Sequence, residues 1–259
     1  SSIAMFAILE NITSVASQEN ATLNGETVRN AILKANELMC AYNDAKGKDS
    51  GATIVMSLMA PDGKTYLGQV GDARAYKIED DGVYMATEDQ SEVFELMALG
   101  VVEKPSEIFT YNRKNIIRHS IGTPKLQPEN VRVFDGNIYD MKAGDKYVLT
   151  CDGVWESVTN SSGDTLTPET KTILDQIDLE FKQANDQIDR DLPGADKATE
   201  RTQRRMRLHK RMQGEIFKRI LLAGHENDTP EQLAKHLTKR EAGNISHDNI
   251  SAVVVERKT

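Results

Sequence analysis

Three aspartates, Asp72, Asp152 and Asp248, each stand at the end of an apolar, strand-like segment or just before one, beside a glycine or an asparagine. A carboxylate at the end of a buried strand is held rigidly while its oxygens face solvent. Several carboxylates that converge there repel one another, and a hard divalent cation such as Mg²⁺ or Mn²⁺ relieves that repulsion. Each aspartate can equally be a turn residue that bonds its own backbone. Spacing alone leaves both interpretations open.

The elements that would position these carboxylates are short strands. Alternating apolar residues and turn signals predict strands at residues 3–9, 53–59, 65–70, 73–78, 83–86, 131–134, 146–150 and 250–255. Pro61-Asp62-Gly63 and Asp80-Asp81-Gly82 are typical hairpin turns between neighbouring strands. The strands are therefore expected to form an antiparallel meander.

Helical periodicity appears at residues 26–40 and 92–99, and Thr229-Pro230 is a typical helix start. A long charged segment at about 167–222 is also predicted to be helical, with a break at Pro193-Gly194. Strands and helices are segregated, without βαβ alternation, which favours an α+β layered fold. We expect residues 1–259 to form a single domain that carries a charged helical insertion at about 167–222.

The composition limits the function classes. The net charge of -8 argues against a nucleic-acid-binding chain. No run of about 18 apolar residues occurs, so we expect no membrane span. The apolar start lacks a basic region and does not resemble a signal peptide. Cys40 and Cys151 are far apart in apolar surroundings, which predicts free thiols and a reducing, cytoplasmic location.

A basic stretch at residues 201–211 interrupts this acidic chain. Its arginines Arg201, Arg204, Arg205 and Arg207 are candidates for binding an acidic partner. A solvated helix face is the alternative interpretation, since runs of charge commonly face water.

Five segments resemble, in order, the motifs of the metal-dependent protein phosphatases of type 2C, the PPM-type Ser/Thr phosphatases. Residues 71–76 (Gly-Asp-Ala-Arg-Ala-Tyr) resemble the family's Gly-Asp-Ser-Arg-Ala-Tyr, and residues 86–91 (Ala-Thr-Glu-Asp-Gln-Ser) its Leu-Thr-x-Asp-His-Ser. Residues 118–122 match the family's Arg-x-Ile/Leu-Gly element. Residues 149–156 (Leu-Thr-Cys-Asp-Gly-Val-Trp-Glu) resemble its Leu-x-Ser-Asp-Gly-Leu-Trp-Asp. Residues 247–255 resemble its closing Asp-Asn-Ile-Thr-Val-Val-Val. Together they extend over most of the chain.

The resemblance implies a four-layer α/β/β/α sandwich of two antiparallel sheets flanked by helix pairs, with two to three Mg²⁺ or Mn²⁺ ions at one rim. In the family the ions generate a hydroxide that attacks phosphoserine or phosphothreonine directly. Carried over by position, Asp152 and Asp248 would bind one ion, and Asp72 with Asp152 another. Arg74 would be structural, paired with an acid.

The N-terminal part departs from the family pattern. The family's phosphate-gripping Arg, its Glu-Asp pair and its Asp-Gly-x-Gly-Gly loop have no close counterpart. Glu10 is the candidate for the bridging aspartate, although its extra methylene displaces the carboxylate. A shortened start would account for this, since the chain begins without Met.

Two hypotheses follow: an Mg²⁺- or Mn²⁺-dependent phosphoprotein phosphatase, or a pseudophosphatase that acts as a binding or regulatory module. The insertion would contact a phosphoprotein substrate or a regulatory protein, or serve as a stabilising cover.

Overall fold

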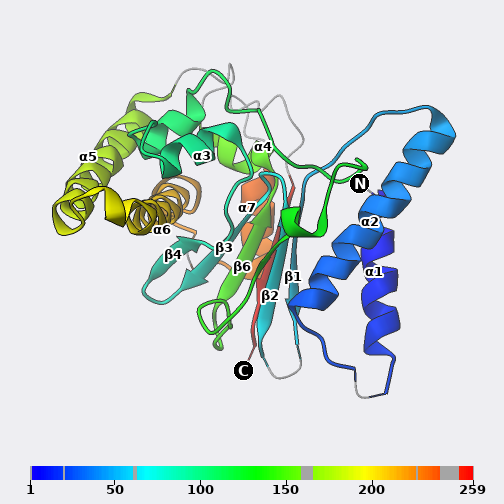
Figure 1. The fold of residues 1–259 in the computed structure, drawn as a ribbon. Helices are drawn as coiled ribbons and strands as arrows, with labels where there is room; N and C mark the ends of the chain where they lie inside the picture. Colours follow the sequence, from blue (N-terminus) through cyan, green and yellow to red (C-terminus); the bar gives the residue numbers. More distant parts are fainter. Residues whose placement is uncertain are drawn as a thin grey trace. The chain divides into compact units, whose positions relative to one another are not determined.

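The computed structural model describes residues 2–19, 21–60, 63–158, 166–225, 227–239 and 251–258. The chain divides into two compact units, which we call unit 1 (Ser1–Ala73 and Ile117–Ala143) and unit 2 (Arg74–Ile116 and Gly144–Thr259). Each unit holds one antiparallel sheet, so the predicted α+β class with two antiparallel sheets is confirmed (Figure 1). The single domain expected from the sequence stays a prediction.

Unit 1 is a helix pair on a three-stranded sheet. The sheet has the order β1-β2-β5 and consists of β1 (Ile54–Met59), β2 (Thr65–Val70) and β5 (Arg132–Phe134). Its helices are α1 (Ser2–Ala16), α2 (Gly25–Lys46) and the short 3-10 helix η2 (Pro128–Asn130). Val28 and Ile32 of α2 lie so close to Gly68 of β2 that a Cβ there would meet them at 2.4 and 2.7 Å. This glycine lets the helix pack directly on the sheet.

The predicted strand at residues 3–9 is wrong, because these residues belong to helix α1. Ala4, Ala7 and Ile8 are buried at helical spacing, whereas Met5 and Phe6 are exposed. A short apolar run fits a strand and a buried helix equally well by pattern. Alanine, methionine and leucine, which are strong helix formers, decide the outcome here.

Unit 2 contains a four-stranded sheet of order β4-β3-β6-β7, covered by helices. Its strands are β3 (Arg74–Glu79), β4 (Gly82–Met85), β6 (Lys146–Thr150) and β7 (Ala252–Glu256). Its α-helices are α3 (Glu92–Ala98), α4 (Asp152–Trp155), α5 (Pro168–Asp191), α6 (Ala198–Ile216) and α7 (Pro230–Thr238). Short 3-10 turns η1 (Pro105–Phe109), η3 (Glu156–Val158) and η4 (Ala195–Lys197) and the π-turn η5 (Phe217–Leu221) connect them.

The charged insertion is a helical hairpin of α5 and α6, as predicted. Thr167 caps α5 by accepting from the Thr170 N–H, and Pro168 occupies the first turn. The chain reverses at residues 192–197, and Arg201 donates to the Leu192 carbonyl there at 2.5 Å. Apolar residues along the inner faces, including Ile177 and Met212, form one buried cluster. The hairpin is therefore an integral part of unit 2.

None of the helices in the described ranges has both the length and the apolar character needed to cross a bilayer.

Candidate functional site

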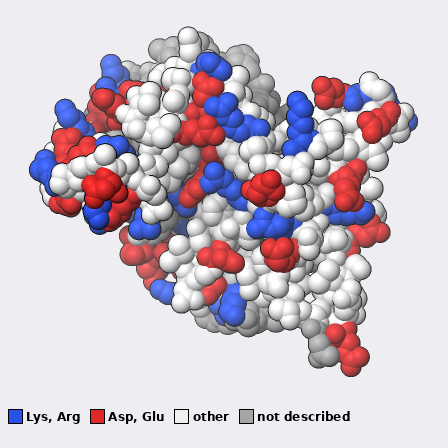
Figure 2. All heavy atoms as spheres, in the orientation of Figure 1, with Lys and Arg blue, Asp and Glu red and all other residues white. Residues whose placement is uncertain are grey.

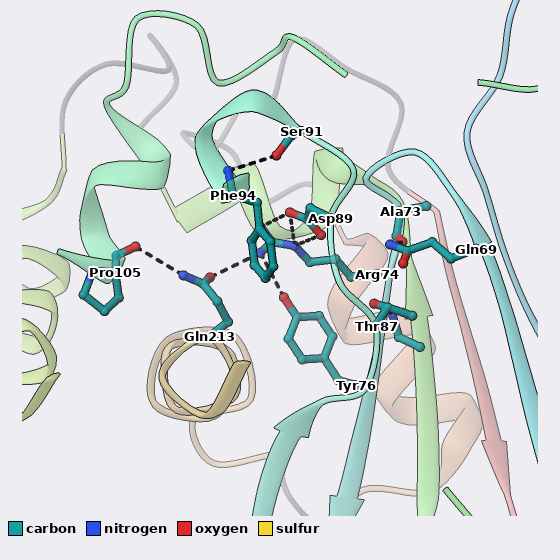
Figure 3. A network of polar contacts seen from close by, with 11 residues as sticks. Gln69, Ala73, Arg74, Tyr76, Thr87, Asp89, Ser91, Phe94, Pro105 and Gln213 are labelled. Carbon is teal, nitrogen blue, oxygen red and sulfur yellow. Dashed lines mark hydrogen bonds and ion pairs between the residues drawn. The ribbon is translucent and has the colours of Figure 1, made fainter. Parts of the chain in front are cut away.

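In unit 1, Asp72 occupies a tight turn directly after strand β2. Gly71 has φ +94°, and a Cβ there would lie 2.4 Å from Thr53 Cγ2, so only glycine fits without strain. The Gln69 side-chain amide donates to the Ala73 carbonyl at 2.9 Å and closes the turn (Figure 3). Asp72 itself is 6% exposed. The local sequence thus fixes a nearly buried carboxylate at this strand end.

In unit 2, Asp152 follows strand β6 and opens the short helix α4. One of its carboxylate oxygens accepts from the Gly153 N–H at 2.9 Å, and the residue is half-buried. Strand β6 is flanked by β3 and β7. Beyond the end of that pairing, the Cys151 N–H donates to the Ser251 carbonyl at 3.2 Å. Asp152 is therefore held at a strand end that is anchored on both sides.

Also in unit 2, a buried polar network surrounds Arg74, which is completely shielded from solvent. Its Nε and Nη2 both donate to the Asp89 carboxylate, the shortest bond being 2.6 Å (Figure 3). Nη1 donates to the Tyr76 hydroxyl at 3.2 Å and to Gln213 Oε1 at 3.3 Å. The guanidinium also lies 4.0 Å above the Trp155 ring. The prediction that Arg74 pairs with an acid is confirmed.

The electrostatics of this network favour the ion pair. Burial by itself disfavours a charged Arg74, but the Asp89 carboxylate outweighs it and leaves the arginine pKa raised. Burial also disfavours the charged form of Tyr76 and so raises the pKa of its hydroxyl, an effect that Arg74 opposes in part. A bidentate arginine–carboxylate pair with further hydrogen bonds is the geometry in which a buried pair can persist. The Arg74–Asp89 pair therefore stabilises the fold.

The segment at residues 86–91 joins the same network. Thr87 Oγ1 accepts from the Ala75 N–H at 3.0 Å, and Ser91 caps α3 by accepting from the Phe94 N–H at 3.4 Å. Gln213 of α6 completes the network by donating to the Pro105 carbonyl at 3.2 Å. Sequence analysis did not identify Gln213, because its partner Arg74 lies 139 positions away.

No family model matches the chain. The serine/threonine phosphatase stp of Listeria innocua is 27% identical to it over 135 residues, which is 52% of this chain and 51% of that relative. The chain thus spans about half of this relative's length. The serine/threonine phosphatase PstP/Ppp of Mycobacterium tuberculosis has a similar fold, with a TM-score of 0.55 and 17% identity over 100% of this chain and 83% of that chain.

The chain is thus similar in sequence to a serine/threonine phosphatase over about half of its length, and it has the fold of the PPM-type Ser/Thr phosphatases. A structure of the PstP catalytic domain, with a TM-score of 0.48 and 19% identity over 83% of this chain and 76% of that one, contains 2 manganese ions. The likeness to PstP/Ppp shows the fold of the chain.

The structure places the predicted metal ligands one by one. Asp72 belongs to unit 1 and Asp152 to unit 2, while Asp248 and the adjacent His247 lie outside the described residues. Within the described ranges, no three or more His, Cys, Asp or Glu side chains gather as a metal site would require. The donor chemistry, carboxylate oxygen, suits Mg²⁺ and Mn²⁺. The metal cluster itself stays a prediction.

Glu10, the candidate for a bridging carboxylate, lies on the exposed side of helix α1. The expectation that it follows a strand is wrong, since residues 3–9 are helical. A carboxylate on the outer face of a helix lacks the rigid hold that a strand end provides. Its part in metal binding is thus left without support from the local structure.

The basic stretch of α6 is largely engaged within the hairpin. Arg205 pairs with Asp189 at 2.6 Å, Arg204 pairs with Glu200 at 2.9 Å, and Arg201 binds backbone carbonyls. Arg207 is exposed. Figure 2 shows basic and acidic side chains interspersed over this part of the surface. These contacts favour a solvated, internally paired helix face, and partner binding by the four arginines stays a prediction.

Proposed function

We propose that the chain is a phosphoprotein phosphatase that hydrolyses phosphoserine or phosphothreonine and depends on Mg²⁺ or Mn²⁺. The observation that carries the proposal is the placement of Asp72 and Asp152 at rigid strand ends in a PPM-type chain. When bound, the divalent ions would activate water at neutral pH and neutralise charge on the phosphoryl group. The four-layer α/β/β/α sandwich expected from the resemblance is proposed together with this function.

Three carboxylates, Asp72, Asp152 and Asp248, would hold the ions. Ser251, three positions after Asp248 in the sequence, lies beside Cys151, which precedes Asp152. This supports a common strand end for the second and third ligands. Arg74 and Asp89 would act indirectly by fixing strand β3, whose first residue is Arg74. Neither Cys40 nor Cys151, both within the described residues, forms a disulfide, and the reducing, cytoplasmic location expected from the sequence is part of the proposal.

The test is hydrolysis of a phosphothreonine peptide by the full chain at millimolar Mn²⁺. We expect turnover that falls at least about 100-fold in Asp152→Asn, because one ligand of the proposed ions is lost. Asp191→Asn, an exposed carboxylate at the end of α5, is the control and should keep full turnover. Absence of turnover in a chain whose folding is verified by circular dichroism would contradict the proposal.

A pseudophosphatase is the second candidate, and one observation favours it specifically. The segment that contains Glu10 is a helix with that carboxylate exposed, so it offers no strand-end ligand of the kind the family uses. The phosphatase assay separates the two functions. Mn²⁺ uptake without phosphopeptide hydrolysis would favour a binding or regulatory module with the same fold.

A further inference from the structure

A pocket of about 530 Å³ lies in unit 2, bordered by α5, α6, the end of α3 and the segment that follows it. Its most buried lining residues are Met97, Phe181 and His209, each no more than 2% exposed. The volume falls within the range of pockets that bind small molecules or single side chains. None of the family motifs contributes to it, so it is separate from the proposed phosphatase site.

His209 gives the pocket an unusual polar group. The side chain is 1% exposed, and neither ring nitrogen makes a hydrogen bond with any described residue. The ring packs on Phe181 with centroids 4.4 Å apart. Burial lowers its pKa to about 4, an effect that the backbone of Met97 opposes only in part, so the imidazole is neutral at pH 7. A neutral imidazole has one donor and one acceptor; the Met97 backbone lies near one of them, and the other ring nitrogen is left for a partner.

Carboxylates outnumber cations around the pocket. Five acidic side chains line it, Glu103, Asp175, Asp178, Asp186 and Asp189, against the basic side chains of Lys104, Lys182 and Arg205. Arg205 is already bound to Asp189 and Asn185. Asp178 accepts from Ser106, and burial raises the pKa of its carboxyl group. With the Arg205–Asp189 pair set aside, acidic side chains still outnumber basic ones in the lining, which favours a cationic occupant.

Aliphatic side chains accompany these charges. Leu179 lines the pocket and is 51% exposed, and Leu99 and Val101 on either side of Gly100 are 64% and 65% exposed. Such exposed leucine and valine side chains can cover the alkyl stem of a ligand or an apolar neighbour of it. A suitable occupant therefore combines an alkyl chain with a cationic end rich in N–H donors.

We propose that this pocket binds an arginine side chain of a partner polypeptide. The guanidinium carries five N–H donors in a planar fork, enough to serve a carboxylate and the neutral imidazole acceptor together. Its three-carbon stem would lie along Leu179 of the pocket lining, and aliphatic residues next to the arginine would cover Leu99 and Val101, which are exposed beside the lining residue Gly100. The partner peptide thus carries arginine between aliphatic residues.

The binding test uses the full chain and an acetylated, amidated peptide in which one arginine stands between two leucines. A matched peptide carries citrulline, which has the shape of arginine without the charge. We expect the arginine peptide to shift the His209 ring resonances saturably in NMR titrations, and the citrulline peptide to bind at least about tenfold more weakly. Equal binding of the two peptides would overturn the proposal.

Variants locate the site. Asp175→Asn and His209→Leu, measured by fluorescence anisotropy of the labelled arginine peptide, should each weaken binding about fivefold or more. Asp191→Asn, a carboxylate of α5 outside the pocket lining, is the matched control and should stay within about twofold. Thermal unfolding of each variant confirms that it is folded. Binding that survives both pocket variants would show that the arginine sits elsewhere and would overturn the proposal.

Discussion

The strand-end Asp152 and the buried Arg74 centre both belong to the motif segments, but their charges have different surroundings. Arg74 and Asp89 neutralise each other out of contact with water, and Tyr76 and Gln213 complete the network. Asp152 is only half-buried, and its carboxylate accepts a hydrogen bond from the neighbouring backbone N–H of Gly153. The comparison teaches that Arg74 and Asp89 form a stability set, whereas the strand-end aspartates are the set to which our proposal assigns the chemistry.

The largest expected effect concerns the stability set. Asp89→Ala leaves Arg74 as an uncompensated buried charge, so the free energy of unfolding should fall by about 3–5 kcal/mol in urea denaturation. The control Asp196→Ala removes an exposed carboxylate and should change it by less than about 0.5 kcal/mol. A loss below about 1 kcal/mol for Asp89→Ala would show that the pair does not hold unit 2 together.

His209 offers a second comparison with Arg74, because its ring is buried without a carboxylate such as Asp89 to stabilise the charged form. Its folded pKa of about 4 lies below the ordinary histidine value, so the unfolded chain binds a proton first as the pH falls. Stability should therefore decrease between about pH 6.5 and pH 4, by roughly 3 kcal/mol in total. His209→Leu should remove this part of the pH dependence in urea unfolding. Identical pH profiles for the two proteins would contradict the assignment.

Gly71→Ala probes the turn that carries Asp72. The new Cβ would combine strain at φ +94° with a 2.4 Å approach to Thr53, which should cost about 1–3 kcal/mol in urea unfolding. Gly136 also has φ +94°, but no heavy atom lies within 4 Å of the point that a Cβ would occupy, so Gly136→Ala measures the backbone strain alone. If the two variants lose the same stability, the close approach to Thr53 plays no part.

The smallest effect is expected at the exposed arginines. Arg204 and Glu200 form an ion pair one helical turn apart on the surface of α6, with side chains 43% and 44% exposed. Arg204→Ala should cost no more than about 0.5 kcal/mol, because water and salt screen such a pair. Unfolding at low and high salt checks this, and a loss comparable to that of Asp89→Ala would remove the distinction between buried and exposed pairs.

Local signals predicted most of the fold. Strands at 65–70 and 146–150 were predicted to the residue, and the hairpin break near Pro193 followed from turn residues between two periodic segments. Residues 3–9 were assigned to a strand in error, because an isolated apolar run carries no reliable period.

Tertiary partners were harder to predict than elements. An acid for Arg74 was expected, but the contribution of Gln213 depends on how α6 packs, which no local pattern encodes. The pocket around His209 was not predicted for the same reason. The sequence around this histidine shows no spacing typical of ligand-binding residues, and the side chains that line the pocket come together only on folding. Convergence of the three aspartates is likewise a property of packing and stays a prediction.

The most direct test of the metal-dependent phosphatase account is calorimetric titration of the folded full chain with Mn²⁺. The account predicts saturable uptake of at least one ion per chain, strongly weakened in Asp152→Asn and unchanged in Asp191→Asn. A wild-type chain that binds no Mn²⁺ at millimolar concentration, or an Asp152→Asn chain that binds it as well as the wild type, would contradict it.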